Sequence, residues 1–173
     1  MAISEMLIAG GLTVTIPADP PQVGWILLFF AGFVIQGMSE ELLCRSFLMV
    51  SLSRRVSYRA AVLINAAMFS ALHLLNPNLA LLPLVNIFLF GILASVLTLR
   101  RGSIWMVGGL HSMWNFAQGN FFGIPVSGIV GSPSPLVAEM GEEGWQTFVN
   151  GGSFGLEGGL AVTVVLAAAC AVV

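Results

Sequence analysis

Residues 23–51, VGWILLFFAGFVIQGMSEELLCRSFLMVS, contain the feature that decides how this sequence is interpreted. Glu40, Glu41 and Arg45 lie within this run, and every other residue in it is uncharged. A run of this length and apolarity is typical of a helix that crosses a membrane. Each charged side chain near the centre of such a helix costs about 2.5–3.5 kcal/mol on insertion scales. The three ionisable groups therefore need partners, and they mark a candidate functional site.

The composition of the whole chain also indicates an integral membrane protein. Of the 173 residues, 57% are hydrophobic and only 8% are charged, whereas soluble domains carry about 25% charged residues. The mean hydropathy is +0.96. A net charge of −2 with no lysine gives no sign of a nucleic-acid partner. The two cysteines, Cys44 and Cys170, lie in apolar runs, so we expect them to be small buried hydrophobic side chains.

Hydrophobic stretches recur along the chain and predict an all-α fold, a polytopic transmembrane bundle with about five membrane-embedded helices. The stretches lie at residues 23–51, 59–75, 80–99, 103–122 and 156–173. The first is longer than a standard span, so we expect it to be tilted or bent near Gly37.

The remaining segments give the expected domain division. Residues 1–22 end in a proline-rich breaker and form a short N-terminal segment, which is either interfacial or the remnant of a larger N-terminal region. Residues 23–173 form the core. Within the core, residues 123–155 are rich in glycine, proline and glutamate, and they predict a long, acidic, turn-rich loop.

Arginines in the short connections predict the orientation and provide a depth scale. Two clusters, at residues 54–59 and 100–101, lie in the first and third connections, which are therefore expected to face the cytoplasm, with the amino terminus outside. Glu40, His73 and Asn115 each lie fourteen residues from the nearest arginine of the adjoining cluster. At 1.5 Å per helical residue, this distance is about 21 Å for all three. His111 is about one turn nearer, so four polar side chains from three helices are expected to meet at one level.

Helical spacing predicts how the other intramembrane polar residues are used. Glu41 and Arg45 are four residues apart, so they share a helix face and can form an ion pair. Glu40 points about 100° away from Glu41 and is free to face another helix. Asn65 and Asn86 are interpreted as structural residues that form hydrogen bonds between helices.

Three short segments together resemble a known family. They are EELLCR with Glu40, Glu41 and Arg45, FSALH with His73, and HSMWN with His111 and Asn115. Their order and spacing resemble the CPBP family of intramembrane proteases, with its EExxxR, FxxxH and HxxxN or HxxxD motifs on successive helices. The family comprises the type II CAAX prenyl proteases and their bacterial Abi relatives, some of them linked to bacteriocin self-immunity. The resemblance covers residues 24–120, and SFGLEGGLAVTVVL is similar to the family's following helix.

The resemblance implies an enzyme, a glutamic-type endopeptidase that needs no cofactor. Glu40 would be the general base for a water molecule, and His73 would hold that water. His111 and Asn115 would form the oxyanion site. These residue types suit the chemistry, because peptide hydrolysis needs an activated water and donors for the developing oxyanion.

The resemblance also implies the surroundings of the reaction. Glu41 and Arg45 would be supporting residues. The partners would be the lipid bilayer and a peptide or protein substrate, which could be membrane-associated or lipidated. The expected location is the plasma membrane of a bacterium or archaeon, in a multi-pass arrangement.

Other functions remain open at this point. Glu40, His73 and His111 form a His/His/Glu set that could hold Zn²⁺ in an intramembrane metalloprotease, although no HExxH motif is present. Intramembrane glutamates and histidines also serve proton relays and transporters. A third alternative is a non-catalytic membrane immunity protein that binds a partner.

Overall fold

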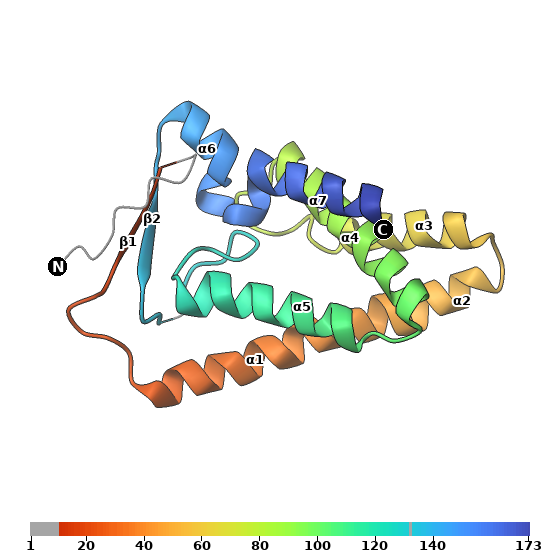
Figure 1. Ribbon diagram of the computed structural model, residues 1–173, viewed down its shortest axis with the longest axis horizontal. Coiled ribbons are helices and arrows are strands. Elements are labelled where there is room, and N and C mark those ends of the chain that lie inside the picture. Colours follow the sequence, from red (N-terminus) through yellow and green to blue (C-terminus); the bar gives the residue numbers. More distant parts are fainter. Residues whose placement is uncertain (1–10, 132) are drawn as a thin grey trace.

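The computed structural model describes residues 11–131 and 133–173 and is mostly helical (Figure 1). The strands and α-helices are β1 (Leu12–Thr15), α1 (Val23–Glu41), α2 (Met49–Ser53), α3 (Tyr58–Ala71), α4 (Leu81–Arg101), α5 (Trp105–Asn115), β2 (Val137–Met140), α6 (Gly144–Asn150) and α7 (Leu160–Val172). Two π-helical stretches, η1 (Leu42–Leu48) and η2 (Phe116–Phe121), directly follow α1 and α5. Two 3₁₀ turns, η3 (Gly152–Phe154) and η4 (Leu156–Gly158), precede α7.

Each of the five apolar stretches contains a helix, but the helices differ in length. In the described part of the chain, two helical segments are long and apolar enough to cross a membrane. They are Val23–Ser53, in which α1, η1 and α2 are continuous over 31 residues, and α4 with 21 residues. Helix α7 is apolar but shorter. The structure thus supports the prediction of a mostly helical protein with helices suited to a membrane. The number of five membrane-embedded helices stays a prediction.

The pattern of burial is the reverse of that in a soluble protein. Glu41 and Arg45 are fully buried, whereas Ile35 and Phe47 on the same long helix are 69% and 68% exposed. Asn65 on α3 is fully buried as well. Soluble proteins almost never bury charged residues fully unless they are paired, and they place most large apolar side chains inside. Outward-facing apolar side chains around a polar interior are what a lipid environment favours.

Small residues bring the helices together. Helix α1 packs against α5, α3 against α4, and α4 against α7. A Cβ atom on Gly37 would lie only 2.9 Å from the backbone nitrogen of Ser112, and a Cβ on Gly91 only 2.9 Å from the Cα of Ala66. Glycine at these positions therefore permits backbones to approach closely. Helix α1 stays α-helical through Gly37, so the irregular part of the first long helix is η1 rather than the expected position.

Polar side chains tie the same helices together, as the sequence predicted for Asn65 and Asn86. The Asn65 amide donates to Ser95 Oγ at 2.9 Å, which joins α3 to α4. The Asn86 amide donates to the Gly159 carbonyl at 3.0 Å and accepts from Thr163 Oγ1 at 2.7 Å, which joins α4 to α7. Both cysteines are free thiols.

The region predicted to be one irregular loop contains regular structure. Strand β2 pairs antiparallel with β1, with Leu12 opposite Met140 and Thr15 opposite Val137. Helix α6 begins with a reciprocal capping box between Glu143 and Gln146. The β1–β2 ribbon closes one end of the molecule (Figure 1). The pairing also places residues 12–15 of the predicted N-terminal segment against the core, while residues 1–10 of that segment lie outside the described residues and the domain division stays a prediction.

Candidate active site

The buried ion pair at the end of α1 forms the base of the site. Arg45 Nη1 donates to Glu41 Oε1 at 3.0 Å, and both side chains are completely inaccessible to solvent. The guanidinium also lies over the ring of Phe69, 4.3 Å from its centre, so a cation–π contact adds to the ion pair. The i, i+4 pairing expected from the sequence is present.

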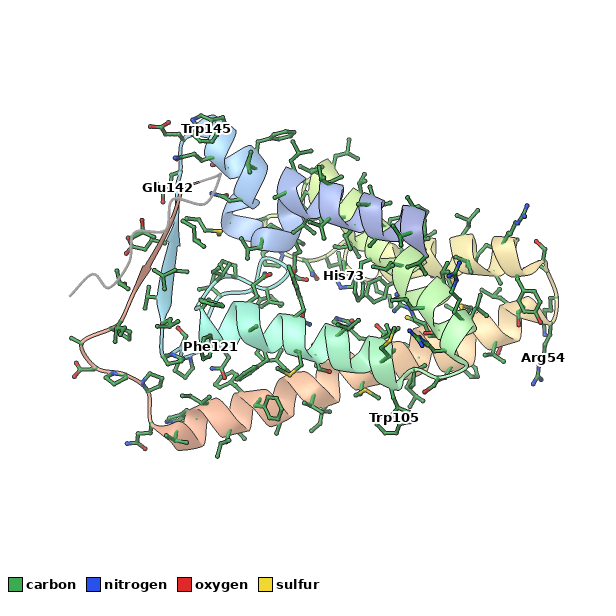
Figure 2. The ribbon with its side chains drawn as sticks, viewed as in Figure 1. Arg54, His73, Trp105, Phe121, Glu142 and Trp145 are labelled. Carbon is green, nitrogen blue, oxygen red and sulfur yellow. The ribbon has the colours of Figure 1, made fainter. Side chains whose placement is uncertain are left out.

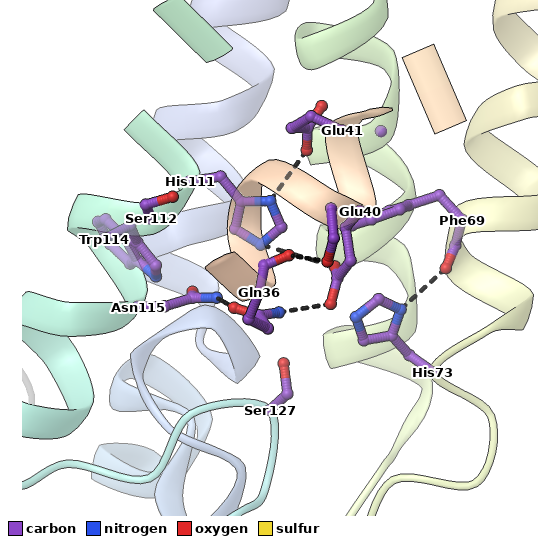
Figure 3. A network of polar contacts seen from close by, with 12 residues as sticks. Gln36, Glu40, Glu41, Phe69, His73, His111, Ser112, Trp114, Asn115 and Ser127 are labelled. Atoms are coloured by element: carbon purple, nitrogen blue, oxygen red, sulfur yellow. Dashed lines mark hydrogen bonds and ion pairs between the residues drawn. The ribbon is translucent and has the colours of Figure 1, made fainter. Parts of the chain in front are cut away.

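His111 connects this pair to Glu40. Its Nδ1 lies 2.9 Å from Glu41 Oε1, and its Nε2 lies 3.8 Å from Glu40 Oε2 (Figure 3). Glu41 Oε1 already accepts from Arg45, so His111 Nδ1 must carry the proton in this hydrogen bond. Its Nε2 is therefore the ring atom that faces Glu40.

Gln36 links Glu40 to Asn115. Its Nε2 donates to Glu40 Oε1, and its Oε1 accepts from Asn115 Nδ2 at 2.9 Å (Figure 3). Gln36 is one helical turn before Glu40, so both side chains project from the same face of α1. The sequence interpretation missed this residue. The sequence does distinguish Gln36, because it is the one amide side chain in the apolar run 23–38.

His73 completes the set from the end of α3. Its Nδ1 is 2.8 Å from the carbonyl oxygen of Phe69. A carbonyl can only accept, so Nδ1 carries the proton and Nε2 is left as an acceptor. Figure 3 shows the ring beside Glu40, and Figure 2 shows His73 inside the helical assembly with Arg54 at its outer end.

A cavity of about 590 Å³ brings these residues together. We call five of the polar side chains that line it the polar cluster: Gln36, Glu40, His73, His111 and Asn115. Asn76, Ser127 and Ser134 line the cavity as well. The rest of the lining is mostly apolar and includes Phe29, Phe33, Leu72, Ile124, Val126, Ile129, Val130 and Val137. The four residues predicted to converge from three helices therefore line one cavity. Glu41 and Arg45 do not line it and lie behind His111.

A second, partly buried carboxylate supports another part of the cavity lining. Glu157, in η4, accepts from the backbone N–H and the hydroxyl of Ser127, and from the indole N–H of Trp114 and the amide of Gln118, both at 3.3 Å. Ser127 lines the cavity. Burial raises the pKa of the Glu157 carboxyl, and the hydrogen bonds oppose that shift. The sequence interpretation assigned no role to Glu157.

The donor set does not fit a metal ion. Among the described residues, no group of three or more His, Cys, Asp or Glu side chains is placed so that it could hold one. We therefore derive no step through zinc at Glu40, His73 and His111.

Comparison with known proteins places the chain among membrane proteases. Residues 22–117 match the family model described as Type II CAAX prenyl endopeptidase Rce1-like. The matched region covers more than half of the chain and contains the whole polar cluster. No curated protein matches the chain. No solved structure matches it either.

Proposed function

Because the chain belongs to the Type II CAAX prenyl endopeptidase Rce1-like family, we propose that it is an intramembrane endopeptidase in which Glu40 activates the attacking water. The family is one of integral membrane proteases, so membership itself supports a peptidase that resides in a membrane. The observation that carries the finer proposal is the polar cluster, in which side chains from three helices line one cavity.

Glu40 and His73 are suited to hold one water molecule. Glu40 Oε1 is occupied by the Gln36 amide, which leaves Oε2 to accept from water. His73 Nε2 is the second acceptor, because Nδ1 is bound to the Phe69 carbonyl. A water with one proton on each acceptor directs an oxygen lone pair away from both. That lone pair is then aimed at a substrate carbonyl held in the cavity.

The reaction then follows general base catalysis. The water oxygen bonds to the carbonyl carbon while one water proton passes to Glu40 Oε2, and the carbonyl electrons move onto its oxygen. When the tetrahedral species collapses, the carbon–nitrogen bond breaks and Glu40 returns the proton to the leaving amine. The products are a carboxylic acid and an amine, and Glu40 is ionised again. The acid then gives its proton to the amine, which leaves a carboxylate and an ammonium group.

Asn115 and His111 are the proposed oxyanion donors. Asn115 Nδ2 has two protons, of which one is donated to Gln36 and the other is available. His111 Nε2 can donate only when the ring is an imidazolium, since Nδ1 already carries a proton. Glu41 accepts from His111 Nδ1, so the tautomer and the orientation of the ring depend on that carboxylate. Glu41 and Arg45 thus act through His111 as supporting residues.

The substrate is a peptide or protein segment, either membrane-associated or lipidated. The apolar part of the cavity lining supports this proposal, because an apolar or lipid-bearing segment would bury its surface there. The polar cluster would then meet the peptide bond in the same cavity.

Replacing the base tests the proposal directly. We expect Glu40→Gln to lower kcat for cleavage of a membrane peptide by about 10²–10⁴-fold, because an amide cannot take the water's proton. The measurement is peptide cleavage by purified protein in detergent, with the thermal melting profile recorded for each variant. The control is Glu142→Gln, which removes an exposed carboxylate of the loop before α6.

Two outcomes would contradict the mechanism. Full activity of Glu40→Gln with an unchanged melting profile would exclude Glu40 as the base. Activity that chelators abolish and Zn²⁺ restores, with about one metal ion bound per chain, would favour the metalloprotease instead.

A further inference from the structure

We propose that Gln36 is a positioning residue that holds Glu40 and Asn115 in a fixed relation across the interface between α1 and α5. This inference rests on the proposed function, because it assigns Gln36 a part in the same reaction. It concerns a residue outside all three motifs on which the family resemblance depends.

Two hydrogen bonds carry the inference. The Gln36 amide nitrogen donates to Glu40 Oε1, and its oxygen accepts from Asn115 Nδ2 at 2.9 Å. One side chain therefore contacts both the proposed base on α1 and the proposed oxyanion donor on α5. Gln36 itself lines the cavity, so the two bonds lie at the reaction site rather than at a remote helix contact.

Only an amide satisfies both neighbours. Glu40 needs a donor, and Asn115 offers a proton that needs an acceptor. A hydroxyl side chain would be too short to span the two groups, and a carboxylate would place two negative charges side by side. A glutamine in the apolar run 23–38 is also costly in a membrane, unless both ends are paired. If the side chain at position 36 only filled space, leucine or methionine would fill it equally well.

The two bonds have separate consequences for the reaction. The bond to Glu40 occupies Oε1, so proton transfer is directed to Oε2, which lies toward His111. The bond from Asn115 fixes the plane of its amide, so the remaining proton of Nδ2 keeps one direction. Without Gln36, both groups would rotate, and the water and the oxyanion donor would no longer be aligned at the same time.

The experiment compares variants of Gln36 in peptide cleavage by the full chain in detergent. Gln36→Met has nearly the same shape and lacks both polar ends. We expect it to keep the melting temperature and the KM of the wild type and to lower kcat roughly ten- to a hundredfold, the effect of losing a hydrogen bond to a charged group. The matched control is Ser51→Ala, which removes an exposed hydroxyl near the far end of the same long helix and should leave kcat unchanged.

A pH profile separates positioning from packing. Gln36→Glu keeps an acceptor for Asn115, but its ionised form cannot donate to Glu40. We expect its kcat relative to the wild type to rise as the pH falls, because two adjacent carboxylates share a proton and the protonated one can donate as the amide did. Gln36→Met should show no such recovery.

A double variant tests the link to Asn115. If both residues act together, Gln36→Met combined with Asn115→Leu should lower kcat by clearly less than the product of the two single effects. Multiplicative effects would overturn the link between them.

The failure of this inference can be told apart from failure of the proposed function. Wild-type kcat in Gln36→Met, together with an inactive Glu40→Gln, would overturn the positioning role and leave Glu40 as the base. Full activity of Glu40→Gln would overturn both. A raised KM with unchanged kcat in Gln36→Met would also overturn the inference, because it would show that Gln36 only shapes the cavity.

Discussion

Glu41 and Glu157 are both enclosed carboxylates near the same cavity, yet the protein stabilises them in different ways. Glu41 lies at the end of α1 and is paired with the Arg45 guanidinium and the His111 ring. Glu157 lies in η4, between helices, and its described hydrogen-bond partners are all neutral donors. One carboxylate is balanced by charge, and the other is held by oriented dipoles.

The difference matches the part of the cavity that each carboxylate supports. The Glu41–Arg45 pair lies behind His111 and sets the tautomer and orientation of this proposed catalytic group. Glu157 accepts hydrogen bonds from Ser127, and the segment that carries Ser127 lines the cavity. We therefore expect changes at the Glu41 side to alter kcat and stability, and changes at the Glu157 side to alter KM.

The largest expected effect comes from removing the arginine of the buried pair. Arg45→Met leaves Glu41 without its cation in an interior that excludes water, so we expect the free energy of unfolding to fall by about 3–5 kcal/mol. Thermal unfolding in detergent measures this change. The double variant Glu41→Leu/Arg45→Met should recover much of the stability without recovering activity. A single variant as stable as the wild type would show that the pair is not needed.

A smaller effect is expected at the other carboxylate. Glu157→Ala removes the acceptor of the Ser127 N–H and hydroxyl, so the cavity segment that carries Ser127 loses these two hydrogen bonds. We expect KM to rise several-fold, kcat to change less than twofold, and the free energy of unfolding to fall by about 1–3 kcal/mol. Steady-state kinetics at several substrate concentrations separates KM from kcat. A fall in kcat at constant KM would contradict this, because it would show that Glu157, like Glu41, supports the catalytic groups.

The smallest effect is a pH dependence of stability. Burial raises the pKa of Glu157 above its usual value of 4.5, so the folded chain keeps this proton at a pH where the unfolded chain has released it. The folded state then binds more protons, and stability falls as the pH rises from about 4.5 through the raised pKa. We expect the melting temperature to fall across that window. Glu157→Gln should flatten the fall, and Glu142→Gln should not.

The sequence was most informative where one helix carries the signal. Apolar stretches predicted every long helix, and helical spacing predicted the contact between Glu41 and Arg45. Distances counted from the arginine clusters predicted that Glu40, His73, His111 and Asn115 would meet, and all four line one cavity. These predictions succeeded because depth along a helix is a linear function of residue number.

The features that the sequence did not predict depend on backbone details or on distant partners. Helices α1 and α5 both change to a π-helix directly after their polar residues, at Leu42 and at Phe116. Such stretches have no simple sequence pattern, although they are frequent at functional sites. The β1–β2 pairing joins segments more than 120 residues apart. Glu157 accepts a hydrogen bond from Ser127, which is thirty residues away in the chain. Its neighbours in the sequence, which are mostly glycines, therefore give no sign of this contact.

The close approach of α1 and α5 limits how the cavity can admit a substrate. At Gly37 the two backbones are so near that even a methyl group would meet Ser112, so these helices cannot slide or shift toward each other. The wall that carries Glu40 and His111 is therefore closely packed. The segment around Ser127 is restrained by Glu157 and by a backbone hydrogen bond from Gly128 to the Phe154 carbonyl at 2.8 Å, so any widening there has to loosen these contacts.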